Sequence, residues 1–152
     1  MEVSASMATW NEINTSLSLE NFMTTFGWFH DSCIKELKYI SGAYVDINLC
    51  MNPINSMRTV KVIFQRQYKE PMVVEVEFSD LINLVLYPVD EKATCDLHGA
   101  SMFIKDGKIY WYDTDHIDSP TNKHNGTWIC ANKVRWRIVD EYIGEEEIYK
   151  HN

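Results

Sequence analysis

The sequence lacks the short motifs that mark many catalytic and nucleotide-binding sites. Glycine accounts for only 6 of 152 residues, and neither Gly-x-x-x-x-Gly-Lys-Ser/Thr nor Gly-x-Gly-x-x-Gly occurs. Such loops need glycine because their backbone approaches the phosphates closely, so their absence argues against a nucleotide site. Gly-x-Ser-x-Gly and His-Glu-x-x-His are also missing, which argues against an α/β-hydrolase and a zinc peptidase. We therefore expect a protein that is not an enzyme.

Cysteines are few and widely separated. The four are Cys33, Cys50, Cys95 and Cys130. No two of them form the close pair through which a tight turn presents two ligands to one zinc ion. All except Cys95 stand beside apolar residues, so we expect small buried thiols in a reducing cytoplasm.

The N-terminal part lacks positive charge. No lysine or arginine precedes Lys35, so the basic start of a secretory signal peptide is missing. The longest stretch without a charged residue, 47–57, contains three asparagines and a proline and is too short to span a bilayer. We expect a cytoplasmic protein without a membrane partner.

Positive charge is also scarce in the whole chain. Lysine and arginine number 14 against 22 aspartates and glutamates, giving a formal charge of −8 and an isoelectric point near 5.0. This charge repels the phosphate backbone, so we expect no nucleic acid ligand. It would favour encounter with a basic protein partner, although the same charge also serves solubility alone.

Hydrophobic periodicity predicts one short helix over residues 16–27. Its apolar face comprises Leu19, Phe22, Met23 and Phe26. Ser18 can cap its start, and Gly27 suits the left-handed position that follows a helix. Residues 1–15 are polar and show no period, so we expect a loosely ordered N-terminus there.

After His30 the dominant period is two, which predicts strands. They are expected over 33–40, 44–49, 58–65, 72–78, 100–105, 108–112 and 127–139. Ser41-Gly42 would join the first two as a hairpin, and Asp106-Gly107 is a stronger hairpin signal. Strands with one apolar and one charged face favour antiparallel pairing. The expected fold class is mainly β (α+β), an antiparallel sandwich or a strongly curved sheet with a short N-terminal helix.

Three local features complete a single domain over residues 1–152. The apolar residues of the strand expected over 33–40 do not all fall on one face, which predicts a β-bulge near Lys35-Glu36. Residues 81–87 are almost continuously apolar, which favours a strand buried on both faces over a helix. Residues 140–152 form an acidic tail that we expect to fray or to form a short exposed helix.

His30-Asp31, directly after an aromatic cluster, is the first candidate site. In an extended chain adjacent side chains point to opposite faces, so these two would not act on each other. A histidine flanked by Trp28 and Phe29 is expected to be buried and hydrogen-bonded. In the alternative, Asp31 caps a turn while His30 lines a pocket.

The second candidate is the loop that carries Asp113, Asp115 and His116, with His124 further on. Two carboxylates and a histidine could hold a divalent cation, but the glycine and terminal glutamate of an EF-hand loop are missing. Aspartates after a hairpin more often form turns. We expect no metal and no cofactor, with Asp113, Asp115 and His116 as the candidate ligands if a metal binds.

Two other groups are candidate binding residues. Arg135 and Arg137 share one face of the last expected strand, as a phosphate or carboxylate site would require. The alternative is cross-strand pairing with Glu75 and Glu77, or with another acidic strand.

The aromatic ribbon Tyr110, Trp111 and Tyr112 precedes Asp113 and Asp115. Interface hot spots favour tryptophan, tyrosine and arginine, so the ribbon predicts aromatic anchors beside acids on a protein-binding surface.

Phe-His-Asp-Ser at residues 29–32, taken with Val-Arg-Trp-Arg at 134–137, resembles a group of small uncharacterised bacterial proteins. These proteins carry a Phe-His-Asp motif after a short N-terminal helix, and some are similar to immunity proteins of polymorphic toxin systems. The resemblance implies a bacterial, cytoplasmic, β-rich protein-binding domain, such as an inhibitor of a basic toxin, and supplies no catalytic residue. The alternative function is a small-ligand or metal-binding domain that uses His30 and the loop from Asp113 to His116.

Overall fold

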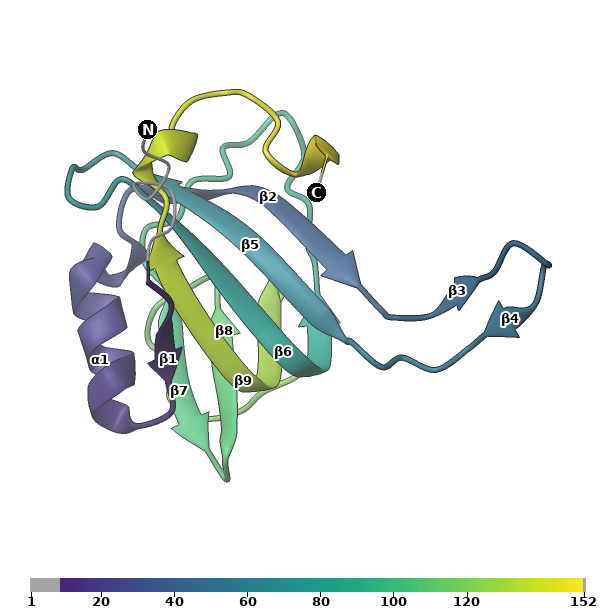
Figure 1. The fold of residues 1–152 in the computed structure, drawn as a ribbon. Coiled ribbons are helices and arrows are strands. Elements are labelled where there is room, and N and C mark those ends of the chain that lie inside the picture. Colours follow the sequence, from purple (N-terminus) through teal and green to yellow (C-terminus); the bar gives the residue numbers. More distant parts are fainter. Residues whose placement is uncertain (1–8, 152) are drawn as a thin grey trace.

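The computed structural model describes residues 9–151, which form one helix and one large antiparallel sheet (Figure 1). The elements are β1 (Asn11–Ile13), α1 (Ser16–Thr25), η2 (Gly27–Phe29), β2 (Ser32–Ile40), β3 (Tyr44–Val45), β4 (Met51–Asn52), β5 (Thr59–Arg66), β6 (Val73–Val85), β7 (Ser101–Lys105), β8 (Lys108–Tyr112), β9 (Trp128–Ile138), η3 (Asp140–Tyr142) and η4 (Tyr149–His151). The large sheet has the order β2-β5-β6-β9-β8-β7, and β1 pairs with β9. The predicted mainly β, antiparallel fold is confirmed.

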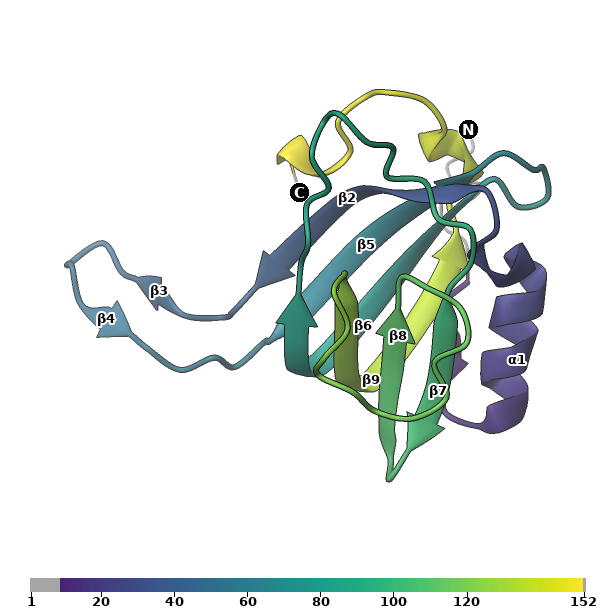
Figure 2. The same ribbon diagram turned by 180° about the vertical axis from the view of Figure 1, so that it is seen from behind.

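The sheet is strongly curved, as one of the two predicted architectures requires. Phe64 on β5 and Trp111 on β8 are separated by two intervening strands, yet their ring centroids lie 5.3 Å apart. Figure 2 shows β8, with β7 beside it, folded in front of β9. The core fills the concave side of the sheet, and α1 covers its edge beside β7.

Aromatic rings from α1 and the sheet form the centre of this core. Phe29 has no exposed surface and lies with its ring centroid 4.8–5.6 Å from four other aromatic rings. These are the rings of Phe22, Phe26, Phe64 and Trp111. Mutually inclined rings at this spacing are favourable beyond their area burial, so Phe29 ties the end of the helix to the sheet.

The start of α1 is capped differently from the prediction. Thr15, not Ser18, is the N-cap, and its side chain accepts a hydrogen bond from the backbone N–H of Ser18. The hydroxyl of Ser18 in turn accepts from the backbone N–H of Thr15, which completes a capping box. At the other end, Gly27 has φ +59°, which confirms its predicted left-handed role.

The prediction of a loosely ordered N-terminus is wrong for residues 9–15, and residues 1–8 lie outside the described part. β1 pairs with β9, from Asn11 opposite Trp136 to Ile13 opposite Val134. A short edge strand of this kind has too few residues to show a period of two in the sequence.

β6 is one long strand where two were expected. It crosses the sheet with a β-bulge between Leu81 and Asn83, which bends the strand. Ile82 and Val85 are exposed, so the predicted burial of this stretch on both faces is wrong. The predicted bulge in β2 is confirmed, because the register with β5 shifts between Ile34 and Glu36.

The C-terminal segment is held against the convex side of the sheet, so the expected fraying is wrong for the described residues, and the alternative of a short helix is met only by the turns η3 and η4. The carboxylate of Asp140 accepts hydrogen bonds from the backbone N–H groups of Met72 and Val73. Further on, the carboxylate of Glu36 accepts from the backbone N–H groups of Ile148 and Tyr149 at 2.7 and 3.0 Å. Apolar side chains of this segment cover a second, smaller cluster around Ile63, Val73 and Val139.

Glu36 makes the attachment of this segment sensitive to acid. Burial opposes its ionisation, but hydrogen bonds from Lys35 Nζ and from the backbone of Tyr149 and Ile148 outweigh burial and lower its pKa below the ordinary 4.5. A lowered folded-state pKa means that the ionised carboxylate stabilises the fold above pH 4.5, and that this contribution is lost as the pH falls through the folded-state pKa.

Replacing Glu36 with glutamine is therefore expected to cost about 1–2 kcal/mol at pH 7 and much less at pH 3. Urea unfolding of both proteins at the two pH values measures the difference. Glu12→Gln, on an exposed side chain of β1, is the matched control and should have no comparable effect. A Glu36→Gln penalty that is equal at pH 3 and pH 7 would contradict this assignment.

The cysteines are all free, and only part of the prediction for them is confirmed. Cys130 is buried and Cys33 partly so, while Cys95 and Cys50 are exposed. The expectation of a buried thiol is wrong for Cys50 because its apolar neighbours are themselves exposed. Within residues 9–151, no helix has the length and apolar character needed to cross a membrane.

Residues 41–57 leave the body of the protein as a projecting segment, here called the arm (Figure 1). The expected hairpin through Ser41-Gly42 is wrong, because β2 pairs with β5 and not with the residues after Gly42. β3 instead pairs with β4 in a separate two-stranded sheet within the arm. The arm points away from the side of the molecule that carries α1 (Figures 1 and 2).

Candidate functional site

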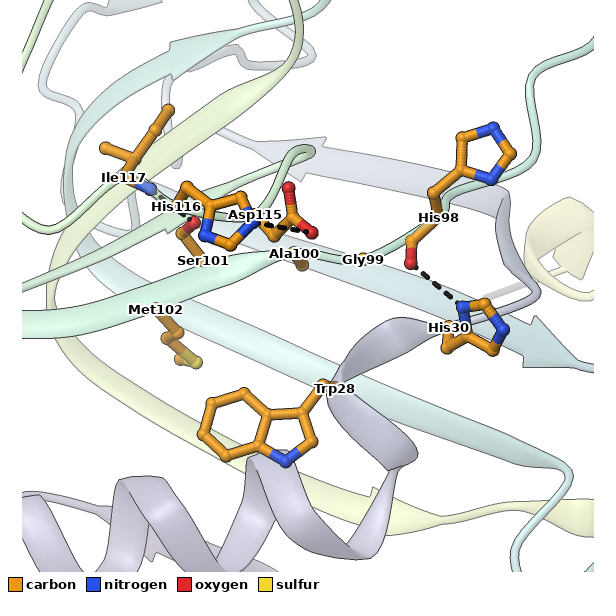
Figure 3. Close-up of a pocket in the computed structure, with 10 residues that line it drawn as sticks. All are labelled: Trp28, His30, His98, Gly99, Ala100, Ser101, Met102, Asp115, His116 and Ile117. Carbon is orange, nitrogen blue, oxygen red and sulfur yellow. Dashed lines mark hydrogen bonds and ion pairs between the residues drawn. The ribbon is translucent and has the colours of Figure 1, made fainter.

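A hollow of about 510 Å³ lies between η2, the segment leading into β7 and the loop after β8 (Figure 3). We call it the histidine hollow. It is lined by Trp28, His30, His98, Gly99, Ala100, Ser101, Met102, Asp115, His116 and Ile117. Three of the residues singled out from the sequence, His30, Asp115 and His116, therefore meet at one place although they come from two distant segments.

An unusual backbone presents Trp28 to this hollow. Gly27, Trp28 and Phe29 all have left-handed φ angles, of +59°, +56° and +66°. Such conformations cost on the order of 1–3 kcal/mol for a residue other than glycine. Burial of the Phe29 ring in the core offsets this cost, and the turn directs the neighbouring indole of Trp28 outward, where it is half exposed.

Two hydrogen bonds join this turn to the segment that leads into β7. The backbone N–H of Ala100 donates to the Trp28 carbonyl at 3.1 Å. His30 Nδ1 lies 3.0 Å from the carbonyl oxygen of His98, and because a carbonyl only accepts, this nitrogen carries a proton. The ring of His98 points away from His30, so His98 contributes its backbone (Figure 3).

The opposite wall is fixed by Ser101 at the start of β7. Its hydroxyl donates to the carbonyl of Thr114 at 2.6 Å and accepts from the N–H of Ile117 at 2.9 Å. These bonds fix the loop on both sides of Asp115 and His116. Gly99 lies beside this loop, and a Cβ there would be in ordinary van der Waals contact with Asp115, 3.4 Å from its Cβ.

The expectation that His30 is buried is wrong, and the alternative of a pocket-lining histidine is the one that the geometry supports. Its side chain is 58% exposed. Asp31 has φ +54°, so the chain turns instead of extending, and its Oδ2 lies 3.4 Å from His30 Nε2. The alternation rule that separated the two side chains does not apply to a turn.

Asp113 does not reach the hollow. One of its carboxylate oxygens contacts His124 Nε2, and the other accepts a hydrogen bond from the N–H of Thr127 at 2.9 Å. It thus closes the loop between β8 and β9, as the turn-forming alternative proposed. Among residues 9–151, no group of three or more histidine, cysteine, aspartate or glutamate side chains is placed to hold a metal ion.

Arg135 and Arg137 are also absent from the hollow, because they pair across β6 and β9 as the alternative interpretation expected. Arg135 Nε lies 2.6 Å from Glu77, and Arg137 binds Glu75 at 2.7 Å. Both guanidinium groups lie over the ring of Trp10, at 4.2 and 4.6 Å from its centroid. This arrangement attaches the N-terminal segment to the sheet and leaves no open anion site.

The aromatic ribbon on β8 is mostly internal, so the prediction of surface anchors is wrong for Trp111 and Tyr112. Trp111 belongs to the main core, where its buried indole N–H has no hydrogen-bond partner among the described residues. Tyr112 is fully buried, and its hydroxyl exchanges hydrogen bonds with the backbone of Thr121. Tyr110 remains half-buried and stacks on Phe103 at 5.1 Å.

A second hollow, of about 700 Å³, lies at the start of β2 and is less suited to chemistry. It contains Asp31, Cys33, Arg66 and Cys95. Burial raises the pKa of Cys33, and the neighbouring Cys95 raises it further. A raised pKa keeps the Cys33 thiol protonated and unreactive, so Cys33 is not an activated nucleophile.

The arm is the second candidate surface, and sequence analysis missed it. Its exposed large apolar side chains are those of Tyr44, Val45, Ile47, Leu49, Met51, Ile54 and Met57. The available signal was the absence of charge over residues 47–57, which we considered only in relation to membranes. Trp28 was likewise missed, because its neighbours Phe26 and Phe29 are buried and it was grouped with them.

Comparisons with known protein families, with curated proteins and with solved structures find no significant match to this chain. The resemblance at residues 29–32 and 134–137 therefore stays a prediction, and any function is argued from the geometry alone.

Proposed function

We propose that this chain is a protein-binding domain that attaches to its partner through the arm. The observation that carries the proposal is the exposure of apolar side chains there, with Ile47 95% and Leu49 85% exposed. Monomeric soluble proteins rarely leave contiguous apolar surface uncovered, and such surface commonly marks a site of interaction. A bound partner would remove these side chains from water.

The arm is built to present these side chains in a defined position. At its base, the N–H groups of Met57 and Arg58 both donate to the carbonyl of Ser41. Gly42 has φ +97° and lies so close that a Cβ there would be 2.7 Å from the backbone nitrogen of Met57. At the tip, Asp46 accepts hydrogen bonds from the N–H groups of Asn48 and Cys50.

The arm nevertheless lacks a core of its own. β3 and β4 contribute two residues each, and an isolated two-stranded hairpin is at best marginally stable in water. Packing against a partner would cover the apolar side chains that the arm itself leaves exposed. This favours a permanent or tight complex over a transient encounter.

We further propose that the protein is an immunity-type inhibitor that covers a basic toxin. Asp46 is the one charged residue in the arm, so nearly all of the formal charge of −8 resides on the rest of the chain. A surplus of negative charge on the body would steer a basic partner toward the protein, after which the arm, with its single charge, would bury its apolar side chains. The net charge supports the proposal of an immunity-type inhibitor, and the arm supports the more general protein-binding role.

Replacing both Ile47 and Leu49 with serine is expected to weaken partner binding by at least a hundredfold, since apolar anchors at an interface centre contribute about 2 kcal/mol or more each. The melting temperature should not change, because both side chains are exposed in the free protein. Leu17→Ser, on the exposed face of α1, is the matched control and should bind as the unaltered protein does.

The measurement is photo-crosslinking from a benzoyl-phenylalanine placed at Tyr44, compared with one placed at Lys105 in the β7–β8 hairpin. A discrete adduct from position 44 that disappears in the double serine variant supports the proposal. Sedimentation of the purified protein then shows whether the partner is a second copy. Equal labelling from both positions, or an adduct that survives the serine changes, would rule out the arm as the contact.

A further inference from the structure

We propose that the histidine hollow binds a cation of the ammonium or guanidinium type that carries an apolar stem. This inference does not depend on the arm, which lies on the other side of the molecule from α1 and η2 (Figure 1). It rests on four features of the hollow: its charge, its indole, its apolar floor and the rigidity of its walls.

The charge of the hollow comes from Asp115. Among the described lining residues it is the only one with a formal charge when histidine is neutral. Its side chain is 56% exposed, and Oδ2 lies 3.5 Å from His116 Nε2. No lysine or arginine lines the hollow, so an anionic ligand would face a carboxylate without a compensating cation.

Trp28 supplies the complementary aromatic face. Its indole lies across the hollow from Asp115 and His116, with the segment leading into β7 between them (Figure 3). Cations are attracted to the negative face of an indole, and tryptophan is the strongest of the aromatic side chains in this respect. A ligand that fills the hollow would therefore meet a carboxylate on one side and an aromatic side chain on the other.

The floor of the hollow suits a hydrocarbon stem. Ala100, Met102 and Ile117 line it with apolar atoms. Ala100 and Met102 are themselves almost fully buried, so the floor belongs to the core and cannot recede. A volume of about 510 Å³ accommodates a side chain or a small amine together with its stem.

The walls are held before any ligand arrives. His30 is fixed to the carbonyl of His98, the backbone carbonyl of Trp28 to the N–H of Ala100, and the loop at Asp115 to the hydroxyl of Ser101. A preorganised site loses little conformational entropy on binding. The strained φ angle of Trp28 is consistent with this role, because strain of this kind concentrates at ligand sites.

The same chemistry has two sources, a free small amine and the lysine or arginine side chain of another protein. The test begins with N-acetylarginine amide as the probe, followed by NMR chemical shifts of the backbone amides of Gly99 and Ala100. We expect a saturable shift at millimolar probe. The uncharged isostere N-acetylcitrulline amide should bind at least fivefold more weakly, since it keeps the shape and loses the charge.

Variants assign the binding to the hollow. Asp115→Asn is expected to weaken the arginine probe at least fivefold and to leave the citrulline probe unchanged. Trp28→Leu should weaken the arginine probe by a similar factor. Asp118→Asn, an exposed aspartate in the same loop outside the hollow, is the matched control and should have no effect. Because Asp115 is exposed, its replacement should leave the fold intact, which thermal melting checks.

A second binding experiment distinguishes the two sources of the cation. A ten-residue peptide with one central arginine that binds at least tenfold more tightly than the free probe points to a protein side chain, and equal affinity points to a small amine. Either result supports the cation site. No saturable shift, equal binding of citrulline and arginine probes, or an unaltered affinity in Asp115→Asn would overturn it. The double serine variant of the arm should bind the probe normally, so this proposal and the proposed function fail separately.

Discussion

Replacing Phe29 with alanine is expected to lower the free energy of unfolding by about 3–5 kcal/mol. The ring is fully buried and contacts four other aromatic rings, so its removal leaves a cavity at the junction of α1, β5 and β8. The loss has a second component, because the buried ring also holds the left-handed backbone of the turn. A small domain has a total stability of about 5–15 kcal/mol, so this one change would remove a large part of it.

Equilibrium unfolding in urea measures the effect, with Trp28→Ala as the adjacent control. Trp28 is half exposed and has a similar left-handed φ angle, so its replacement should cost no more than about 1 kcal/mol. Should Phe29→Ala fail to fold, Phe29→Leu is expected to retain the fold with a smaller loss. Similar losses for Phe29→Ala and Trp28→Ala would show that the turn does not depend on the buried ring.

Most of the structural details that sequence analysis predicted correctly are local ones. Gly27 after α1, the bulge beside Lys35 and the Asp106-Gly107 hairpin each depend on the conformational preferences of a few neighbouring residues. The pairing of Arg135 with Glu77 was also foreseen, because matching charges on alternating positions restrict which strands can be neighbours.

The arm shows what local patterns cannot supply. Ser41-Gly42 has the composition of a tight turn, yet β2 finds its partner in β5, beyond the whole arm. The choice between a nearby and a distant partner is decided by burial, because Val60, Val62 and Phe64 on β5 supply a core face. Residues 44–49 alternate as regularly but offer no buried neighbour, so their periodicity alone was misleading.

The histidine hollow could be predicted only in part. His30, Asp115 and His116 are candidates from the sequence alone, but their place in one hollow involves a hydrogen bond between His30 and the backbone of His98, 68 positions away. The contribution of Trp28 depends on three successive left-handed residues, which no propensity predicts for tryptophan or phenylalanine. Asp31 lies beside His30 because the chain turns at Asp31, whereas the alternation rule assumes an extended chain.

Replacing Arg137 with methionine is expected to destabilise the protein by about 3–5 kcal/mol, because it leaves the carboxylate of Glu75 buried without its cation. The side chain of Glu75 is only 4% exposed, and Arg137 contacts its Oε1 at 2.7 and 2.9 Å. The hydroxyl of Tyr149 donates to Oε2 at 2.6 Å, but a neutral donor cannot replace the lost charge. Burial, followed by this hydrogen bond, raises the pKa of Tyr149, which keeps the hydroxyl protonated as a donor.

The neighbouring pair provides the control for this prediction. Arg135 pairs with Glu77 across the same two strands and lies over the same Trp10 ring, but the side chains of Arg135 and Glu77 are 38% and 12% exposed, more than those of Arg137 and Glu75. Arg135→Met should therefore cost less than Arg137→Met in urea unfolding, about 1–2 kcal/mol.

A variant that also neutralises Glu75 distinguishes the effect of its unpaired charge from the effect of the lost arginine packing. The double change Glu75→Gln with Arg137→Met removes the charge while the amide oxygen still accepts from Tyr149. It should recover at least half of the loss, since an apolar replacement of a buried pair costs far less than the removal of one partner. Both arginines also cover Trp10. If Arg137→Met and Arg135→Met cause equal losses and the double variant shows no recovery, the lost stability comes from uncovering that ring and not from the buried charge.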